Sequence, residues 1–369
     1  MLDSLYIKNF RNLKDFKIKS LERVNLMTGK NNTGKSTILE AIEIYATKAD
    51  IETLIEQLEN RGEIDKRGRE ENIEESIKSF CSLFHNRSID FVNNDKITIG
   101  TTEETLFGNL LSSKNYVGIQ IVKYKEIEDE GNTYRRRRII EENDDINEYE
   151  VGLNIEFDNR NSIIKFNNIV RHSRMFNRRK FFNSFQFIKT KSIEKQINSQ
   201  LWDKITLTDK EQYVINALKI IEPNVERIAF IEGYKNERSP VIKVKGEKQV
   251  LPLKSMGDGI NRILTIILAL VNAEGGTLLI DEFENGLHHT VQEQLWKMIF
   301  LLAKELDIQV FATTHSEDCI RGFENVLNDY DIDTNGKLIR LDRKGDKIVQ
   351  VEFDKEELKV ATDFDIEIR

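Results

Sequence analysis

The segment Gly29-Lys30-Asn31-Asn32-Thr33-Gly34-Lys35-Ser36 decides the fold class of this chain, because it matches the pattern G-x-x-x-x-G-K-[ST] in full. An apolar segment over 24–27 precedes the match, and a segment with helical periodicity over 36–45 follows it. In this order of strand, loop and helix, the glycines allow backbone N–H groups to surround anionic oxygens. The start of the helix adds the positive end of its dipole. The sequence therefore predicts an α/β protein that binds a nucleotide.

Each position of this loop has an expected role in holding ATP and Mg²⁺. We expect Lys35 to reach the β- and γ-phosphates and the Ser36 hydroxyl to bind the metal ion. The predicted phosphate-binding residues are Gly29, Asn31, Asn32, Thr33, Gly34, Lys35, Ser36 and Thr37.

Two acidic residues follow a second apolar strand, Thr277–Ile280. A parallel strand that is buried on both faces has this composition, and ligands bind beyond its C-terminal end. We expect Asp281 to bind Mg²⁺, directly or through water, and Glu282 to polarise the water that attacks the γ-phosphate. His315 follows the next apolar strand and is expected to donate a hydrogen bond to the γ-phosphate or to this water. Lys35, Glu282 and His315 are the predicted catalytic residues.

The composition excludes several classes of protein. The chain has 369 residues, with 55 Lys and Arg against 63 Asp and Glu, and a net charge of −8. Hydrophobic residues make up 39% of it, which is too many for a globally disordered chain. An apolar run of 18 residues and a secretory signal are both absent from the sequence, so we expect no membrane partner. The two cysteines, Cys81 and Cys319, favour a cytoplasmic protein without a disulfide framework.

A second small-residue helix start lies shortly before the acidic strand, in Pro252-Leu253-Lys254-Ser255-Met256-Gly257-Asp258-Gly259. The order of phosphate loop, Ser-x-Gly segment, acidic strand and histidine resembles the ABC-type ATPase heads of the SMC, RecF and OLD families. The OLD-like (AAA_15/AAA_21) ATPases are the most similar. Three segments carry this likeness: Ile7-Lys8-Asn9-Phe10-Arg11-Asn12-Leu13, Asp281-Glu282-Phe283-Glu284-Asn285-Gly286-Leu287-His288 and Ala312-Thr313-Thr314-His315-Ser316.

The resemblance implies roles for residues that the local motifs leave open. Ser255, Gly257 and Asp258 become the trans signature, which contacts the γ-phosphate of the other subunit in a head-to-tail homodimer. Asn285, Gly286 and His288 fall in the D-loop at the dimer interface, and His288 stands where transporter ATPases usually carry Asp. Arg11 and Asn12 are placed near the base or ribose. Gln186 is a candidate for the metal-binding glutamine.

The expected fold is an α/β ABC-ATPase head, a P-loop NTPase with a parallel sheet core, an antiparallel β lobe and an inserted helical lobe. Strands that alternate with helices in the last third predict the parallel sheet, and a period of two over 89–170 predicts the antiparallel lobe. The expected parts are 1–48, the N-terminal part of the head with the phosphate loop; 49–88, a helical insertion; 89–190, the antiparallel lobe with a basic segment; 191–249, a helical lobe and connecting strands; and 250–369, the C-terminal part of the head.

The basic segment inverts the acidic balance of the chain and interleaves cations with phenylalanines. Nucleic acid or an acidic partner would suit such a patch, and so would a surface helix whose phenylalanines face the core. Its cations are Arg171, Arg174, Arg178, Arg179 and Lys180.

Three functions are compatible with the sequence. The first is an ATPase that dimerises on ATP and controls a separate effector, such as the sensor subunit of a bacterial anti-phage system. About 50 residues follow His315, too few for the C-terminal Toprim domain of OLD nucleases, so a Toprim- or HNH-type nuclease is expected on another chain. The second is a RecF-like repair ATPase that clamps DNA. The third is a nucleotide-gated scaffold with little turnover, against which the presence of Glu282 argues.

Overall fold

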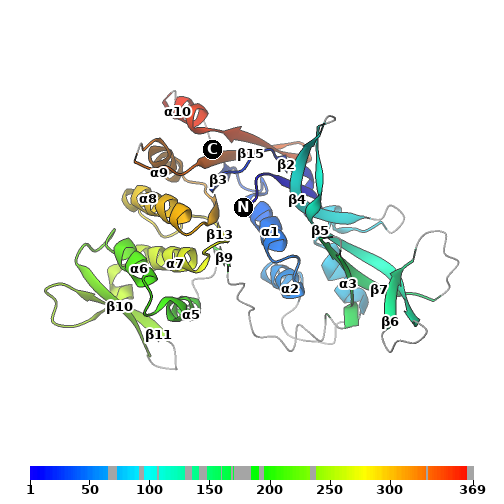
Figure 1. Cartoon of the computed structure of the whole chain (residues 1–369), viewed down its shortest axis with the longest axis horizontal. Coiled ribbons are helices and arrows are strands. Elements are labelled where there is room, and N and C mark those ends of the chain that lie inside the picture. The colour runs from blue at the N-terminus through cyan, green and yellow to red at the C-terminus, as the bar shows by residue number, and fades with distance from the viewer. Residues whose placement is uncertain are drawn as a thin grey trace.

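The structure is a computed structural model that describes residues 1–64, 73–90, 95–105, 108–128, 135–140, 148–158, 160–167, 169, 184–190, 195–232, 238–329 and 331–363. The predicted basic patch over 171–180 lies outside these residues, and so do parts of the helical insertion. The described part is a mixed α/β fold, as the sequence predicts. A parallel sheet lies at its centre, an antiparallel sheet on one side and a small third sheet on the other (Figure 1).

The central sheet has the strand order β16–β15–β3–β14–β13–β9. Its neighbours pair in parallel except β16, which runs antiparallel to β15. The strand before the phosphate loop lies in the middle, and strands from the C-terminal part of the sequence flank it on both sides. The strands are β3 (Val24–Gly29), β9 (Phe185–Ile188), β13 (Thr277–Ile280), β14 (Gln309–Thr313), β15 (Gly336–Lys344) and β16 (Lys347–Phe353).

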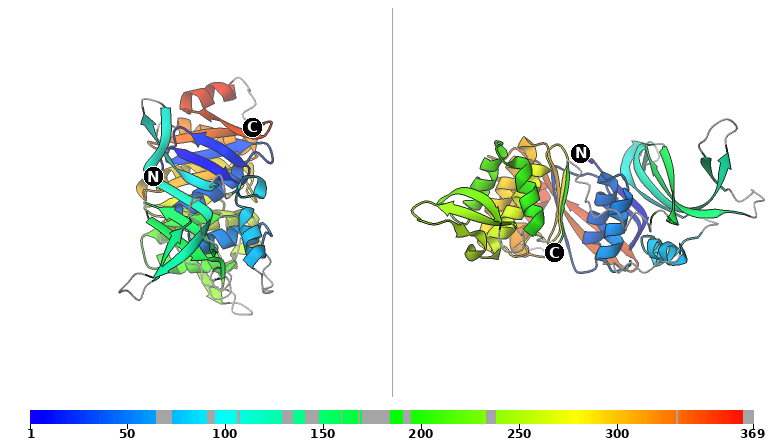
Figure 2. Two further views of the ribbon diagram at one scale, coloured as in Figure 1. Left: turned by 90° about the vertical axis from the view of Figure 1, so that its right-hand side faces the viewer. Right: turned by 90° about the horizontal axis from the view of Figure 1, so that it is seen from below.

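The described helices are α1 (Lys35–Ala46), α2 (Ile51–Asn60), α3 (Ile73–Cys81), α5 (Lys195–Ile205), α6 (Lys210–Leu218), α7 (Asp258–Asn272), α8 (His289–Glu305), α9 (Glu317–Asn328) and α10 (Lys355–Asp363). Helices lie on both faces of the central sheet, because alternate residues of its apolar strands point to opposite sides. Leu278 and Ile280 pack into the core that α5–α10 share, and Leu279 packs into the core of α1–α3. Helix α1 lies between the central and the antiparallel sheet (Figure 2).

The antiparallel sheet has the strand order β2–β1–β4–β5–β7–β8, with β6 paired to β5. Strands β1 and β2 form a hairpin within residues 2–28, and β1 pairs with β4. This sheet therefore combines segments from two of the expected parts of the chain, 1–48 and 89–190. Conversely, β9 lies within 89–190 but pairs with β13 in the central sheet. The strands are β1 (Leu5–Phe10), β2 (Leu13–Ile18), β4 (Lys96–Thr105), β5 (Gly108–Glu128), β6 (Arg135–Ile139), β7 (Glu150–Phe157) and β8 (Arg160–Lys165).

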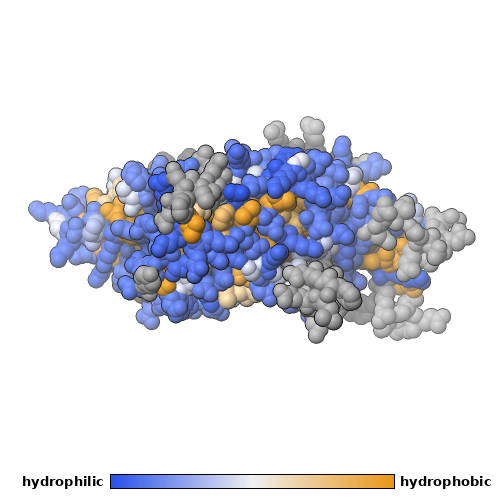
Figure 3. Space-filling model, turned by 90° about the horizontal axis from the view of Figure 1, so that it is seen from above, coloured by the Kyte–Doolittle hydropathy of each residue, from blue (hydrophilic) through white to orange (hydrophobic). Residues whose placement is uncertain are grey.

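The third sheet leads into the helix that carries the predicted trans signature. It consists of β10 (Val225–Glu232), β11 (Arg238–Val244) and β12 (Leu251–Pro252), followed by the 3-10 helix η3 (Leu253–Met256) and then α7. A further 3-10 helix, η1 (His85–Arg87), follows α3. Within the described ranges, no helix is long and apolar enough to cross a membrane. The face seen in Figure 3 is mostly hydrophilic, with its apolar side chains in separate groups.

Candidate nucleotide-binding and catalytic site

The phosphate loop runs from the end of β3 to the start of α1, and two of its glycines adopt conformations that favour glycine. Gly34 has a φ of 92° and caps α1, and Gly29 has a φ of 139°. A Cβ atom on Gly29 would lie 2.3 Å from the main-chain oxygen of Leu341 in β15. The Lys35 ammonium donates to the main-chain oxygens of Gly29 at 2.6 Å and Lys30 at 2.9 Å. The Lys35 side chain therefore folds back over the phosphate loop, where it is predicted to bind phosphate.

The carboxylate of Asp281 accepts hydrogen bonds from three other segments at the C-terminal edge of the central sheet. The Ser36 hydroxyl, at the start of α1, lies 3.1 Å from each of its two oxygens. Thr313, at the end of β14, donates to Oδ1 at 2.7 Å, and Thr190, just after β9, donates to Oδ2 at 3.2 Å. Parallel strands bring their C-terminal ends to one edge, where ligands bind. The predicted partners Ser36 and Asp281 thus lie in direct contact.

These residues fit a magnesium ion. The contact between Ser36 and Asp281 offers a hydroxyl and a carboxylate, the oxygen ligands that Mg²⁺ takes when it also binds substrate phosphates. Among the residues that the structure describes, no group of three or more His, Cys, Asp or Glu side chains would hold a metal ion without a substrate. Ser36 and Asp281 are therefore the residues that would hold the metal of a bound Mg–ATP.

Glu282 and His315 line the same cavity as Gly34, Lys35 and Ser36. Glu282 has a φ of 51°, in the left-handed region, and its N–H donates to Thr313 Oγ1 at 2.9 Å. Burial, with a smaller effect of the Lys35 charge, lowers the pKa of His315 below its ordinary value of 6.5. His315 is therefore neutral near pH 7 and able to exchange hydrogen bonds without a fixed positive charge.

Glu284 holds the histidine segment against the acidic segment. Its carboxylate accepts a hydrogen bond from the His315 N–H at 2.7 Å and another from the Thr314 hydroxyl at 2.8 Å. No short motif indicates a role for Glu284, although it lies inside the Asp281–His288 segment. The sequence does not indicate Thr190 either, because a single threonine after a strand carries no recognisable pattern.

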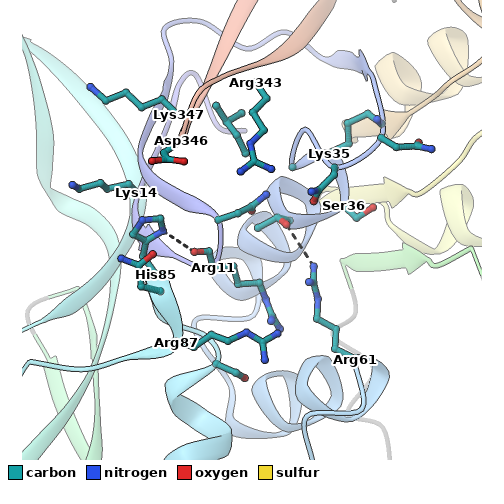
Figure 4. Close-up of a pocket in the computed structure, with 18 of the residues that line it drawn as sticks. Arg11, Lys14, Lys35, Ser36, Arg61, His85, Arg87, Arg343, Asp346 and Lys347 are labelled. Carbon is teal, nitrogen blue, oxygen red and sulfur yellow. Dashed lines mark hydrogen bonds between the residues drawn. The ribbon is translucent and has the colours of Figure 1, made fainter.

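The cavity has a volume of about 1020 Å³ and lies between the phosphate loop, the turn that joins β1 and β2, η1 and the tip of the β15–β16 hairpin (Figure 4). Asn12 and Arg11 both line it. Asn12 Nδ2 lies 3.5 Å from where a Cβ atom on Gly34 would stand. The Arg11 guanidinium lies 2.9 Å from a Glu40 oxygen and 3.0 Å from a Glu63 oxygen, and its side chain extends away from Lys35. Arg11 is thus held by acidic side chains of the protein.

The structure does not bring Gln186 to the site. Gln186 lies within β9 in register with Leu278, three residues before the level of Asp281. Three residues of strand span about 10 Å. The β9 segment instead presents Thr190 to Asp281.

The predicted trans signature and D-loop lie on exposed turns. Ser255, Gly257 and Asp258 are all exposed where η3 meets α7, and Gly257 caps this helix with a φ of 95°. Asn285, Gly286 and His288 are exposed as well, and His288 caps α8 by accepting the N–H of Thr290. Of the described residues that line the cavity, none comes from these two segments.

Comparison with known proteins agrees with this geometry. Residues 1–320 match the AAA_15 family, described as an AAA ATPase domain. The chain belongs to the AAA_15 family. A Helicobacter pylori protein named ATP/GTP phosphatase is 28% identical to this AAA_15 chain over 365 residues, which cover 92% of each protein. The uncharacterized protein MJECL10 of Methanocaldococcus jannaschii is 42% identical over 45 residues, or 12% of this chain and 20% of that protein.

A solved structure shares the fold of the AAA_15 chain. The structure of an SMC head bound to the C-winged helix domain of ScpA matches it with a TM-score of 0.52 and 12% sequence identity. The match covers 97% of this chain and 99% of that one. The expected fold, an ATPase head of the SMC type, is confirmed.

We expect nucleotide binding by the AAA_15 chain to depend on pH through Lys35. Burial lowers the pKa of Lys35 to about 8, although Asp281, Glu284 and Glu282 oppose the shift. The charged form, which phosphates favour, therefore prevails only below this pH. We expect the Kd for ATP to rise above pH 8, by up to about tenfold per pH unit. Calorimetric titration between pH 7 and 9.5 measures it.

The matched control is Lys30→Met, which removes an exposed lysine of the same loop. This variant should keep the pH profile of the wild type. An affinity for ATP that stays constant from pH 7 to 9.5 in the wild type would contradict a phosphate-binding role of Lys35.

Proposed function

We propose that this chain hydrolyses ATP and that two copies of it close head to tail on two ATP molecules. One observation carries the proposal: Ser36 contacts both oxygens of Asp281 at 3.1 Å, while Lys35, Glu282 and His315 line the cavity beside this contact. A triphosphate in the loop would thus meet a cation, a metal-binding pair and a candidate base within one cavity.

The chemistry follows from where these side chains lie. Lys35 exchanges the main-chain oxygens of Gly29 and Lys30 for phosphate oxygens, so its charge stabilises the transferring group. Ser36 and Asp281 would hold Mg²⁺, which when bound would supply further positive charge to the phosphate oxygens. Glu282 lines the cavity and is the residue that would accept the proton of the attacking water. Neutral His315 donates a hydrogen bond to the γ-phosphate or to this water.

Exposure of the trans signature supports the head-to-tail dimer. Ser255, Gly257 and Asp258 lie at the start of a 15-residue helix whose dipole favours anions, yet they face solvent away from their own cavity. In a head-to-tail dimer this helix start meets the γ-phosphate of the partner. The D-loop residues Asn285, Gly286 and His288 are exposed on a second turn and would lie at the same interface.

We further propose that the dimer controls a separate effector protein, such as the nuclease of an anti-phage system. The OLD-like sequence segments support this role. The SMC head bound to a domain of ScpA supports the general idea that a head of this fold carries a partner protein. Co-purification from the native cell followed by mass spectrometry identifies that partner.

Replacing the proposed base tests the function directly. Glu282→Gln keeps the size and polarity of the side chain but no longer accepts a proton. We expect ATP hydrolysis to fall by about 10²- to 10⁴-fold with the Kd for ATP unchanged. Phosphate release and calorimetric titration measure the two quantities. The control is Glu356→Gln, which changes an exposed residue of α10 and should hydrolyse ATP normally. Wild-type turnover in Glu282→Gln would show that Glu282 is not the base.

A second variant tests the dimer. Ser255→Arg should leave ATP binding intact, because Ser255 does not line its own cavity, but it should block the ATP-dependent dimer by placing a bulky cation in the interface. Light scattering of the slow Glu282→Gln background with ATP measures the dimer. Thr208→Arg is the matched control: Thr208 is also exposed, and its hydroxyl also bonds the main-chain oxygen three residues earlier. A Ser255→Arg chain that still dimerises would contradict the trans signature.

A further inference from the structure

Arg262 is a buried cation behind the acidic segment. It lies one turn into α7, is 1% exposed, and is surrounded by the apolar residues of that helix. A guanidinium in an apolar core is unfavourable unless it is paired or hydrogen-bonded. Its Nη2 donates to the main-chain oxygen of Asp281 at 3.0 Å and to that of Glu282 at 2.8 Å. Within the described residues, its Nε and Nη1 atoms have no hydrogen-bond partner.

These two hydrogen bonds stabilise an unfavourable backbone conformation at Glu282. Glu282 has a φ of 51°, a conformation that residues with a Cβ rarely adopt unless their surroundings impose it. Arg262 holds the carbonyl of Glu282 from the side of α7. Thr313 holds its N–H from the side of β14, at 2.9 Å. The peptide groups on both sides of the Glu282 Cα atom are therefore fixed, and with them the direction in which its side chain leaves the backbone.

The positive charge of Arg262 also stabilises the acidic segment. Asp281, Glu282 and Glu284 place three carboxylates within one turn of the chain, and the guanidinium of Arg262 lies behind them. A positive charge at this place offsets their mutual repulsion. Arginine suits the position because one of its terminal nitrogens, Nη2, reaches both main-chain oxygens and the group keeps its charge when it is buried.

We propose that Arg262 is a positioning residue for Glu282: it directs the carboxylate into the cavity by holding the main-chain oxygens of Asp281 and Glu282. The proposal rests on the proposed function, in which Glu282 is the base. Arg262 itself touches neither nucleotide nor water; it acts through Glu282. Its contribution therefore belongs to the chemical step and not to the binding of ATP.

The experiment compares Arg262→Met and Arg262→Lys with Arg23→Met in the full-length chain. Arg23 is the matched control, because its guanidinium also donates to two main-chain oxygens, those of Ala303 at 3.0 Å and Ile308 at 3.4 Å. It lies before the start of β3, whereas the site lies beyond the end of that strand. Each variant is measured for kcat, KM, the Kd for ATP and the thermal midpoint.

We expect kcat to fall about tenfold to hundredfold in Arg262→Met, because a misplaced catalytic group costs a factor of this size. The Kd for ATP should stay within about threefold of the wild type, since the phosphate loop is unchanged. Arg262→Lys, which keeps the charge but not the planar fork, should lose less. Arg23→Met should lower the thermal midpoint and leave kcat unchanged.

A double-variant cycle separates positioning from a general structural effect. In the Glu282→Gln background, Arg262→Met should cause no further loss in single-turnover hydrolysis, because the group that it positions is already absent. An additional loss, or a wild-type kcat in Arg262→Met alone, would overturn the inference. Should the methionine variant not fold, Arg262→Lys carries the same cycle. Wild-type turnover in Glu282→Gln would instead overturn the proposed function.

Discussion

The carboxylate of Asp281 is the group on which the arrangement of the site depends. It accepts hydrogen bonds from Ser36, Thr313 and Thr190, which follow three different strands of the central sheet. Asp281 is only half-buried, but hydrogen bonds to an ionised carboxylate are stronger than those between neutral groups. These contacts hold the phosphate loop, the acidic strand and the strand before His315 together at one edge of the sheet. The Mg²⁺ ion of a bound nucleotide would use the oxygens that meet here.

The architecture explains why the site needs the whole chain. β3 pairs with β14 on one side and β15 on the other, so residues 24–29 lie between segments from beyond residue 300. The long insertion between them forms the antiparallel sheet except β1 and β2, the third sheet, and helices α2, α3, α5 and α6. Its contributions to the site are local: Thr190 reaches Asp281, and η1 forms one wall of the cavity. Pairing β3 with strands that lie so far along the chain costs conformational entropy. Burial of apolar side chains in the two cores that flank the sheet offsets this cost.

The sequence predicted the parts of the site that short motifs encode. Lys35, Ser36, Glu282 and His315 line one cavity, and Asp281 contacts Ser36. Each of them follows a buried parallel strand, and the composition of such strands is visible in the sequence. Gln186 shows where this reasoning fails. Its segment does form a strand of the central sheet, but the register that places Gln186 opposite Leu278 depends on pairing between distant residues. Arg262 and Thr190 lie outside any motif, and only the tertiary structure brings them to Asp281. Arg11 does line the cavity, yet Glu40 and Glu63 hold its guanidinium.

The most direct test of this account measures the metal ion at Asp281. In electron paramagnetic resonance with Mn²⁺ and a non-hydrolysable ATP analogue, the wild type should bind one Mn²⁺ per chain with hyperfine coupling to the phosphates. Asp281→Asn and Ser36→Ala should each weaken Mn²⁺ binding by about tenfold or more, whereas Asp318→Asn, an exposed change on α9, should leave it unchanged. Wild-type affinity for Mn²⁺ in both site variants would show that the contact between Ser36 and Asp281 does not form the metal site.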